Sequence, residues 1–158
     1  MQFEHQHHEE THQLVGEFLS ELFDSPYLDQ ETAHFYVAYG STVLEVSVEP
    51  YGPEETIVEV TAYCVQGVER QDKLLLGLLE LNHELPVGAF SLVGTDVFFS
   101  QSIFGRSLDG RNLLGMIAAV ANISDEYDDR IVEAYGGQTA LDRIRDTGGR
   151  RRRSSVKD

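Results

Sequence analysis

The N-terminal segment contains the one short motif in this sequence that could do chemistry by itself. His8, Glu9 and His12 match the pattern H-E-x-x-H. On a helix, this spacing places two imidazoles one turn apart, where they bind Zn²⁺ while the glutamate acts as a general base. One interpretation of the sequence is therefore a small metal-dependent hydrolase that uses the HEETH segment.

The surroundings of the motif favour another interpretation. The motif lies among polar residues, and no apolar run around it predicts a helix buried enough to exclude water from a metal. A third ligand would have to come from Glu31 or His34. We therefore predict no catalytic residues, no enzyme activity and no cofactor. At most, Zn or Ni binds adventitiously to the N-terminal histidines, which are His5, His7, His8 and His12.

A glycine-containing segment further along resembles a phosphate-binding loop. Gly105 and Gly110 have the required spacing, but Arg111 and Asn112 stand where the loop needs Lys and Ser or Thr. The phosphates would lack their lysine, and Mg²⁺ would lack its hydroxyl. We therefore expect no nucleotide site, and we expect Asp109 to cap the N-terminus of the helix that follows.

The remaining reactive side chains have structural interpretations. Cys64 alternates with Val60 and Ala62 on the apolar face of a predicted strand, so we expect a buried thiol. It is the only cysteine, which leaves no disulfide within the chain. The acidic run over 125–129 lacks the glycine and the spacing of a calcium loop, and it reads as a solvated helix face.

The charge distribution excludes further partners. The 158 residues include 12 Lys and Arg against 27 Asp and Glu, a formal net charge of -15. Residues 148–158 hold 5 of the bases and 1 acid, so residues 1–147 hold 7 bases and 26 acids, a net charge of -19. Such a body repels phosphates, so we expect no nucleic-acid partner. Electrostatic mimicry of a nucleic acid is a weaker alternative.

The chain is expected to be a cytoplasmic protein with one domain. No run approaches the roughly 20 apolar residues of a membrane span, and the polar N-terminus is no secretory signal. We place a flexible His-rich segment at 1–9, the domain at 10–147 and a disordered basic tail at 148–158. The sequence offers no explanation for the Arg150–Arg153 run in that tail.

Hydrophobic periodicity predicts the elements of this domain. Main helices are expected over 10–23, 69–84 and 111–135, strands over 34–39, 42–49, 56–65, 87–93 and 96–104, and one more short helix over 138–146. The order α-β-β-β-α-β-β-α, with short links and alternating strands, predicts an α+β fold. In this fold, helices cover one face of an antiparallel sheet.

The predicted second helix carries more leucine than one core contact requires. A first stripe is expected to face the sheet; it consists of Leu74, Leu78, Leu81 and Leu85. Leu75, Leu76 and Leu79 lie outside that stripe, and exposed apolar surface is unfavourable by about 25 cal/mol per Å². We predict that these three leucines mediate self-association as a homodimer. The alternative is that the first or last helix covers them within the protomer.

Two tyrosines are candidates for contact with another protein. Tyr36 and Tyr63 lie on predicted strands, and tyrosine is enriched at protein interfaces. If both face away from the helices, they form a patch for an unidentified protein partner or client. Partly exposed aromatic residues of a sheet are an equally ordinary interpretation.

The second half of the chain resembles the YbjN-type domain, a bacterial family associated with sensory transduction regulation, within the type III secretion chaperone-like fold. The resemblance rests on the element order and on five short segments: Leu81–Glu84, Gly88–Leu92, Val97–Phe99, Leu113–Leu114 and Tyr135–Gly137. It implies a cytoplasmic homodimer, commonly packed through the second helix, that works by binding protein rather than by catalysis. The resemblance carries over no catalytic residues.

Overall fold

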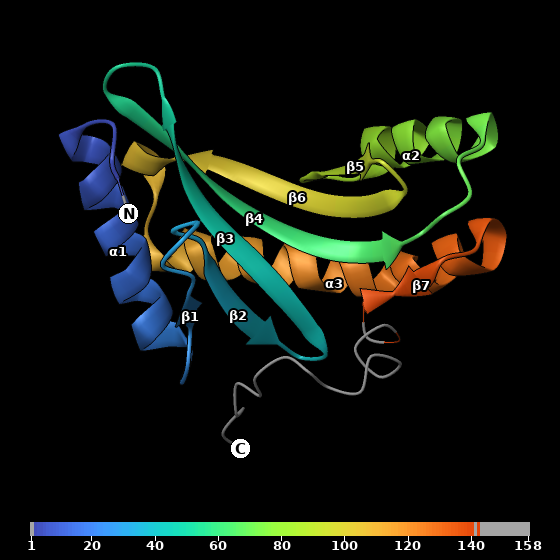
Figure 1. Ribbon diagram of the computed structural model, residues 1–158, viewed down its shortest axis with the longest axis horizontal. Helices are drawn as coiled ribbons and strands as arrows, with labels where there is room; N and C mark the ends of the chain where they lie inside the picture. The colour runs from blue at the N-terminus through green and yellow to red at the C-terminus, as the bar shows by residue number, and fades with distance from the viewer. Residues whose placement is uncertain (1, 141, 143–158) are drawn as a thin grey trace.

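A seven-stranded antiparallel sheet forms the centre of the computed structural model, which describes residues 2–140 and 142 (Figure 1). The strands follow the order β1-β2-β3-β4-β6-β5, and β7 pairs with β4. Their bounds are β1 Tyr27–Leu28, β2 Phe35–Tyr39, β3 Thr42–Tyr51, β4 Glu55–Gln66, β5 Ala89–Val93, β6 Asp96–Phe104 and β7 Gln138–Thr139.

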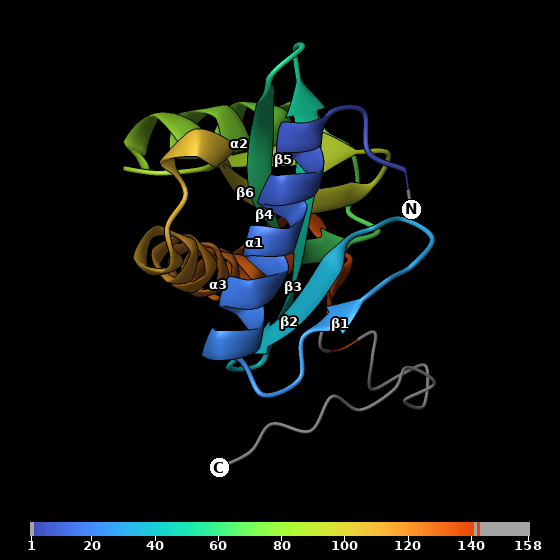
Figure 2. The same ribbon diagram turned by 90° about the vertical axis from the view of Figure 1, so that its left-hand side faces the viewer.

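Three α-helices lie on one side of this sheet and leave its other face open (Figures 1 and 2). They are α1 (Gln6–Leu22), α2 (Asp72–Glu84) and α3 (Gly110–Tyr135), with a short 3₁₀ helix, η1 (Gly105–Ser107), before α3. The long helix α3 contacts β3, β4 and β6, whereas α2 packs beside β5. This arrangement confirms the predicted α+β fold.

Alternation along the strands explains the layering. Inward residues such as Leu44, Val60 and Phe99 are fully buried beneath the helices, while their neighbours in sequence face the open side. A register shift in β4 between Tyr63 and Val65 changes this alternation, so that Cys64 and Val65 are both buried.

The structure corrects several predicted boundaries. Helix α1 begins at Gln6, so part of the segment predicted as flexible, 1–9, is helical. The predicted helix over 138–146 is wrong at its start, because Gln138 and Thr139 pair with β4. Beyond residue 139, only residues 140 and 142 of that helix are described. The basic tail 148–158 lies outside the described residues.

Helix α1 is tied to the sheet by a close approach at its first half. The Oγ1 of Thr56 on β4 donates a hydrogen bond to Thr11 Oγ1 at 3.2 Å. Gly105 lies against the same two threonines, and a Cβ there would overlap the Thr56 hydroxyl. These polar contacts help to hold residues 6–12 against the sheet. They cannot be predicted from the pattern of apolar residues in the sequence.

Candidate functional site

The first histidine of the HEETH motif is part of the α1 packing. Only 8% of the His8 surface is exposed. Its Nε2 lies 3.0 Å from the carbonyl oxygen of Val48 on β3, and its Nδ1 accepts a hydrogen bond from the backbone N–H of Glu4 at 3.3 Å. Both ring nitrogens therefore have backbone partners.

The second motif histidine is used in the same way. His12 is buried, its Nε2 lies 2.8 Å from the carbonyl oxygen of Ala33, and its ring packs at a tilt against that of Phe35, with 4.7 Å between the ring centroids. The suggested third ligand, His34, is engaged by Glu45 and Glu49, at 3.2 and 3.4 Å.

No group of His, Cys, Asp or Glu in residues 2–140 and 142 is arranged to hold a metal ion. The structure therefore gives no support to the hydrolase interpretation, and it places His8 and His12 in structural roles.

The other reactive groups also have structural partners. Asp109 Oδ1 accepts a hydrogen bond from the backbone N–H of Asn112 at 2.7 Å, which confirms the predicted cap of α3. Cys64 is buried with its Sγ 3.0 Å from Ser124 Oγ, and burial raises the pKa of the thiol to about 12. A thiol with that pKa stays protonated at neutral pH and is a poor nucleophile.

The leucines of α2 divide between a buried and an exposed face. Leu74 and Leu78 are buried against the core. Leu75, Leu76 and Leu79 are 39%, 60% and 66% exposed. We call these three residues the α2 leucine face. Within the described structure, neither α1 nor α3 covers it, so the intramolecular alternative does not hold.

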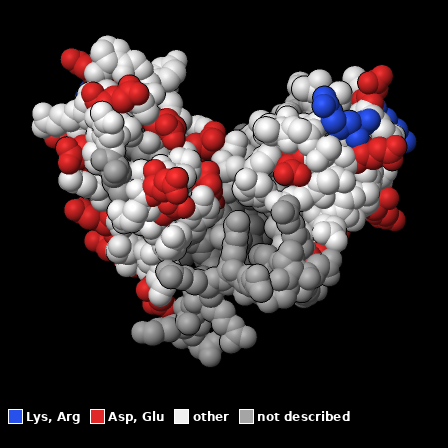
Figure 3. All heavy atoms as spheres, viewed as in Figure 1, with Lys and Arg blue, Asp and Glu red and all other residues white. Residues whose placement is uncertain are grey.

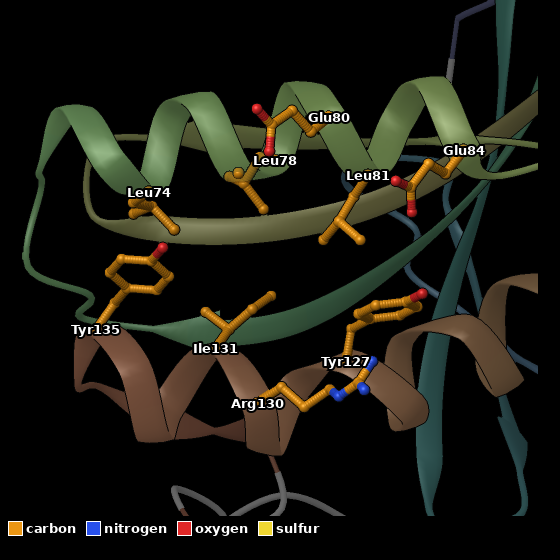
Figure 4. A pocket seen from close by; sticks show the side chains of 10 residues that line it. Leu74, Leu78, Glu80, Leu81, Glu84, Tyr127, Arg130, Ile131 and Tyr135 are labelled. Carbon is orange, nitrogen blue, oxygen red and sulfur yellow. The ribbon is translucent and has the colours of Figure 1, made fainter.

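A groove of about 310 Å³ lies on the opposite flank of α2, between α2 and α3 (Figure 4). Apolar side chains from both helices line its floor: Leu74, Leu78, Leu81 and Ile131. Tyr135 lies at one end, where its hydroxyl donates a hydrogen bond to the carbonyl of Lys73 at 3.3 Å. The groove can therefore accept an apolar side chain.

The rim of the groove is charged on both sides. Glu80 and Glu84 line it from α2, and Arg130 lines it from α3, with its guanidinium 5.3 Å from the ring centroid of Tyr127. Away from the groove, Asn82 exchanges two hydrogen bonds with the backbone of Phe90, at 2.6 and 3.0 Å. These bonds fix the rotation of α2 and, with it, which leucines face outward.

The open face of the sheet holds both predicted partner-binding tyrosines. Tyr36 on β2 donates a hydrogen bond to Glu45 Oε2 at 2.7 Å, and burial together with this carboxylate raises the pKa of Tyr36. Tyr63 on β4 packs its ring 4.4 Å from that of Phe98. The two tyrosines lie on the same face of the sheet.

Sequence reasoning missed most apolar side chains of this face. Val43, Tyr51 and Phe104 are exposed at outward positions of β3 and β6; Val43 lies near Tyr63, whereas Tyr51 and Phe104 lie towards the other end of the strands. A signal was present, because a large apolar residue at an outward position interrupts the expected polar alternation. Which of these residues lie next to one another depends on the strand register, and the sequence alone does not give that register.

Figure 3, viewed from the side of the open face, shows acidic side chains on the visible left and right parts of the molecule, whereas the visible basic side chains gather at the end where α2 lies. No helix of the described residues is long and apolar enough to cross a membrane. The fold thus presents exposed apolar side chains in an acidic setting. Exposed apolar surfaces of this kind are typical of sites at which proteins bind other polypeptides.

A comparison with known protein families identifies the family of this chain. The family model described as "T3SS (YopN, CesT) and YbjN peptide-binding chaperone 1" matches residues 9–143. The chain belongs to this family, and the predicted resemblance to the YbjN-type domain is confirmed. None of the curated proteins matches the chain significantly.

Solved structures confirm the secretion-chaperone fold. The chain is similar to a structure described as "Crystal Structure of the ExsC-ExsE Complex", at 14% identity and a TM-score of 0.58 over 78% of this chain and 94% of that chain. It is also similar to "Structure of the HopA1-SchA Chaperone-Effector Complex", at 14% identity and a TM-score of 0.56 over 74% and 91% of the two chains.

Proposed function

We propose that this protein is a non-enzymatic homodimer that binds a flexible segment of a client protein, in the manner of a chaperone or of a regulator. Membership of a family of peptide-binding chaperones supports the binding role. Two structural relatives were solved as complexes, one of them described as a chaperone–effector complex, which supports a protein client.

The observation that carries the proposal is the α2 leucine face. An apolar face left exposed on a packed helix favours association by about 25 cal/mol for each Å² removed from water. Lys73, Glu80 and Glu84 occupy the other flank of the helix, so association need not bury these three charges, whereas Asp72 and His83 lie at the two ends of the leucine side.

The proposed dimer leaves room for a client. At 100° per residue, Leu75 and Leu79 lie on the flank of α2 that holds Asn82, which bonds to edge strand β5. The groove lies on the opposite flank. Two copies can therefore pack their α2 leucine faces together with twofold symmetry while the grooves and the open sheet faces remain accessible.

The proposed setting is the cytoplasm, as the sequence predicts. The acidic body favours basic or neutral clients through long-range attraction. Nothing in the described structure favours mimicry of a nucleic acid over this role, because the exposed apolar surfaces have no part in such mimicry.

A peptide-binding assay tests the function directly. Fluorescent peptides of varied sequence, each too short to fold, are titrated with the full chain and followed by anisotropy. We expect saturable binding of a subset that combines large apolar residues with Lys or Arg. A uniform absence of binding across apolar, basic and mixed peptides would contradict the proposed function.

A further inference from the structure

The open face of the sheet carries two apolar rows that run across the strands. The strand register places residues of β3, β4 and β6 side by side in the first row. The second row consists of residues of β4 and β6, and an aromatic ring from the end of β3 lies beside it. The first row is Val43, Tyr63 and Phe98; the second is Ile57 and Phe104, with the Tyr51 ring 5.8 Å from that of Phe104 and with Glu49 opposite Ile57 on β3.

Two polar rows separate them, and both contain a carboxylate. One row is Glu45, Thr61 and Ser100, and the other is Ser47, Glu59 and Ser102. Glu59 accepts a hydrogen bond from the Ser102 hydroxyl at 3.0 Å. Within the described residues, no Lys, Arg or His forms an ion pair with Glu59, and Glu45 pairs with His34 alone.

The spacing of these rows matches an extended chain. Six residues separate Ile57 from Tyr63 on β4, which is a distance of roughly 20 Å at about 3.3 Å per residue. A strand laid face to face on the sheet has the same two-residue repeat. Its side chains 1, 3, 5 and 7 therefore meet four successive rows, whereas a helix advances about 1.5 Å per residue and does not keep this register.

We propose that the open sheet face binds an extended client segment with two large apolar side chains six residues apart and a Lys or Arg between them. The apolar side chains pack on the two apolar rows, and the cation lies over Glu45 and Glu59. The inference rests on the proposed function and specifies its substrate class.

Charge supports a basic centre for this segment. The hydroxyl of Tyr36 holds Glu45, and that of Ser102 holds Glu59, so both carboxylates have a hydrogen-bonded position before a client binds. A cation that approaches an oriented, partly buried carboxylate gains more than one that approaches a fully solvated carboxylate. An acidic residue at the same position in the client would be repelled.

Designed peptides test the spacing and the charge separately. The reference peptide has Phe at positions 1 and 7, Lys at position 5 and Ser or Thr elsewhere. A second peptide moves the later Phe to position 5 and Lys to position 3, and a third replaces Lys with Glu. We expect the reference peptide to bind the full chain at least about tenfold more tightly than either of the others, because each loses a matched row.

Protein variants locate the site. Phe104→Ser and Tyr63→Ser each remove one aromatic ring from an apolar row and should weaken binding of the reference peptide by about tenfold. Glu59→Gln should weaken it a few-fold and reduce the dependence on salt. Leu114→Ser, which removes an exposed apolar side chain from α3 on the helical side, is the matched control and should leave binding unchanged. A melting curve of each variant checks that the fold is retained.

The outcomes separate this inference from the function on which it rests. Equal affinity for all three peptides, or unchanged affinity in folded Phe104→Ser, would overturn the inference. If varied peptides bind but the reference peptide crosslinks to the α2–α3 groove, the client site lies there and only the inference fails. Binding that appears only after residues 148–158 are removed would assign the face to the chain's own basic segment and contradict the proposal. If no peptide binds at all, the proposed function fails as well.

Discussion

Several polar residues of this protein hold elements of the fold together. His8 and His12 bond to backbone carbonyls, and Thr11 and Thr56 bond to each other beside Gly105. A motif such as HEETH can therefore arise from packing requirements, because a buried imidazole needs hydrogen-bond partners as much as a metal site needs imidazoles.

Removal of metal should have no effect on this protein. Because the Nε2 atoms of His8 and His12 lie within hydrogen-bond distance of backbone carbonyls, we expect an unchanged melting temperature in excess chelator. His8→Ala should lower stability by about 1–2 kcal/mol, since it leaves the Val48 carbonyl without its partner. Differential scanning calorimetry measures both effects. A chelator-dependent melting temperature in the wild type, abolished by His8→Ala, would contradict this structural role.

The close approach at Gly105 predicts a sensitive position. Gly105→Ala places a Cβ against the Thr56 hydroxyl and should destabilise the protein by about 2 kcal/mol in urea unfolding. Gly115→Ala is the matched control, because a Cβ at this helical glycine meets open space and should be neutral or stabilise by up to about 1 kcal/mol. Equal unfolding midpoints for the two variants would contradict the described packing of α1.

The free energy of unfolding should depend on pH through the carboxyl group of Asp128. Burial, with help from neighbouring carboxylates, raises the pKa of Asp128 from 3.8 to about 6. The folded state therefore binds this proton more tightly than the unfolded state. The resulting stabilisation is complete below about pH 4 and is lost as the pH rises through about 6.

Replacement of this carboxyl group isolates its contribution. Asp128→Asn should raise the unfolding free energy above pH 6 and have little effect near pH 4. Because the side chain is partly exposed, solvent screening keeps the gain below about 1 kcal/mol. Unfolding in urea at both pH values, with exposed Glu126→Gln as the control, measures this. A gain of the same size at both pH values would show that ionisation is not its cause.

At the scale of elements, the two flanks of helix α2 differ in their surroundings. Asn82 anchors it to β5, Leu74 and Leu78 are buried, and the α2 leucine face remains in contact with solvent. The groove on the other flank lies between α2 and α3. The proposed self-association through the α2 leucine face therefore leaves the groove and the open sheet face accessible.

Substitutions on the α2 leucine face should separate assembly from folding. Leu76→Ser with Leu79→Ser should convert the proposed dimer to a monomer in light scattering at micromolar concentration. The melting temperature extrapolated to low protein concentration should not fall, because neither side chain is buried in the protomer. Leu114→Ser should leave the mass unchanged. A wild-type protein with the mass of one 17.7 kDa chain would contradict the dimer.

The elements with long periodic patterns could be predicted from the sequence. The second and third main helices, the strands of the meander and the Gly94–Thr95 hairpin follow from alternation, turn residues and caps. The first turn of α1 could not, because tertiary hydrogen bonds rather than an apolar stripe hold it. The two-residue strands β1 and β7 are too short to carry a pattern.

The candidate surfaces could be predicted only in part. Surplus leucine on one helix is visible in the sequence, so Leu75, Leu76 and Leu79 were identifiable as exposed candidates. The apolar rows of the open face were not, because they join residues of three strands that are brought together by register. Tyr63 was found on its own, without its neighbour Phe98.

At the scale of the whole molecule, one covered and one open sheet face define the function we propose. The helical side supplies the core that keeps the sheet rigid, and the open side presents apolar and acidic rows at fixed spacing. A rigid surface of this kind suits an extended segment, because the protein does not need to reorganise when the client binds. The client alone loses conformational freedom, which favours segments that are unfolded before binding.

Discrimination between unfolded and folded polypeptide is therefore the most direct test. A single model protein is prepared in its native form and in a reduced, alkylated form that cannot fold, and each is titrated into the full chain by calorimetry. We predict saturable binding of the unfolded form and no measurable binding of the native form. Equal binding of both forms, or binding of the native form alone, would contradict the assignment as a binder of flexible client segments.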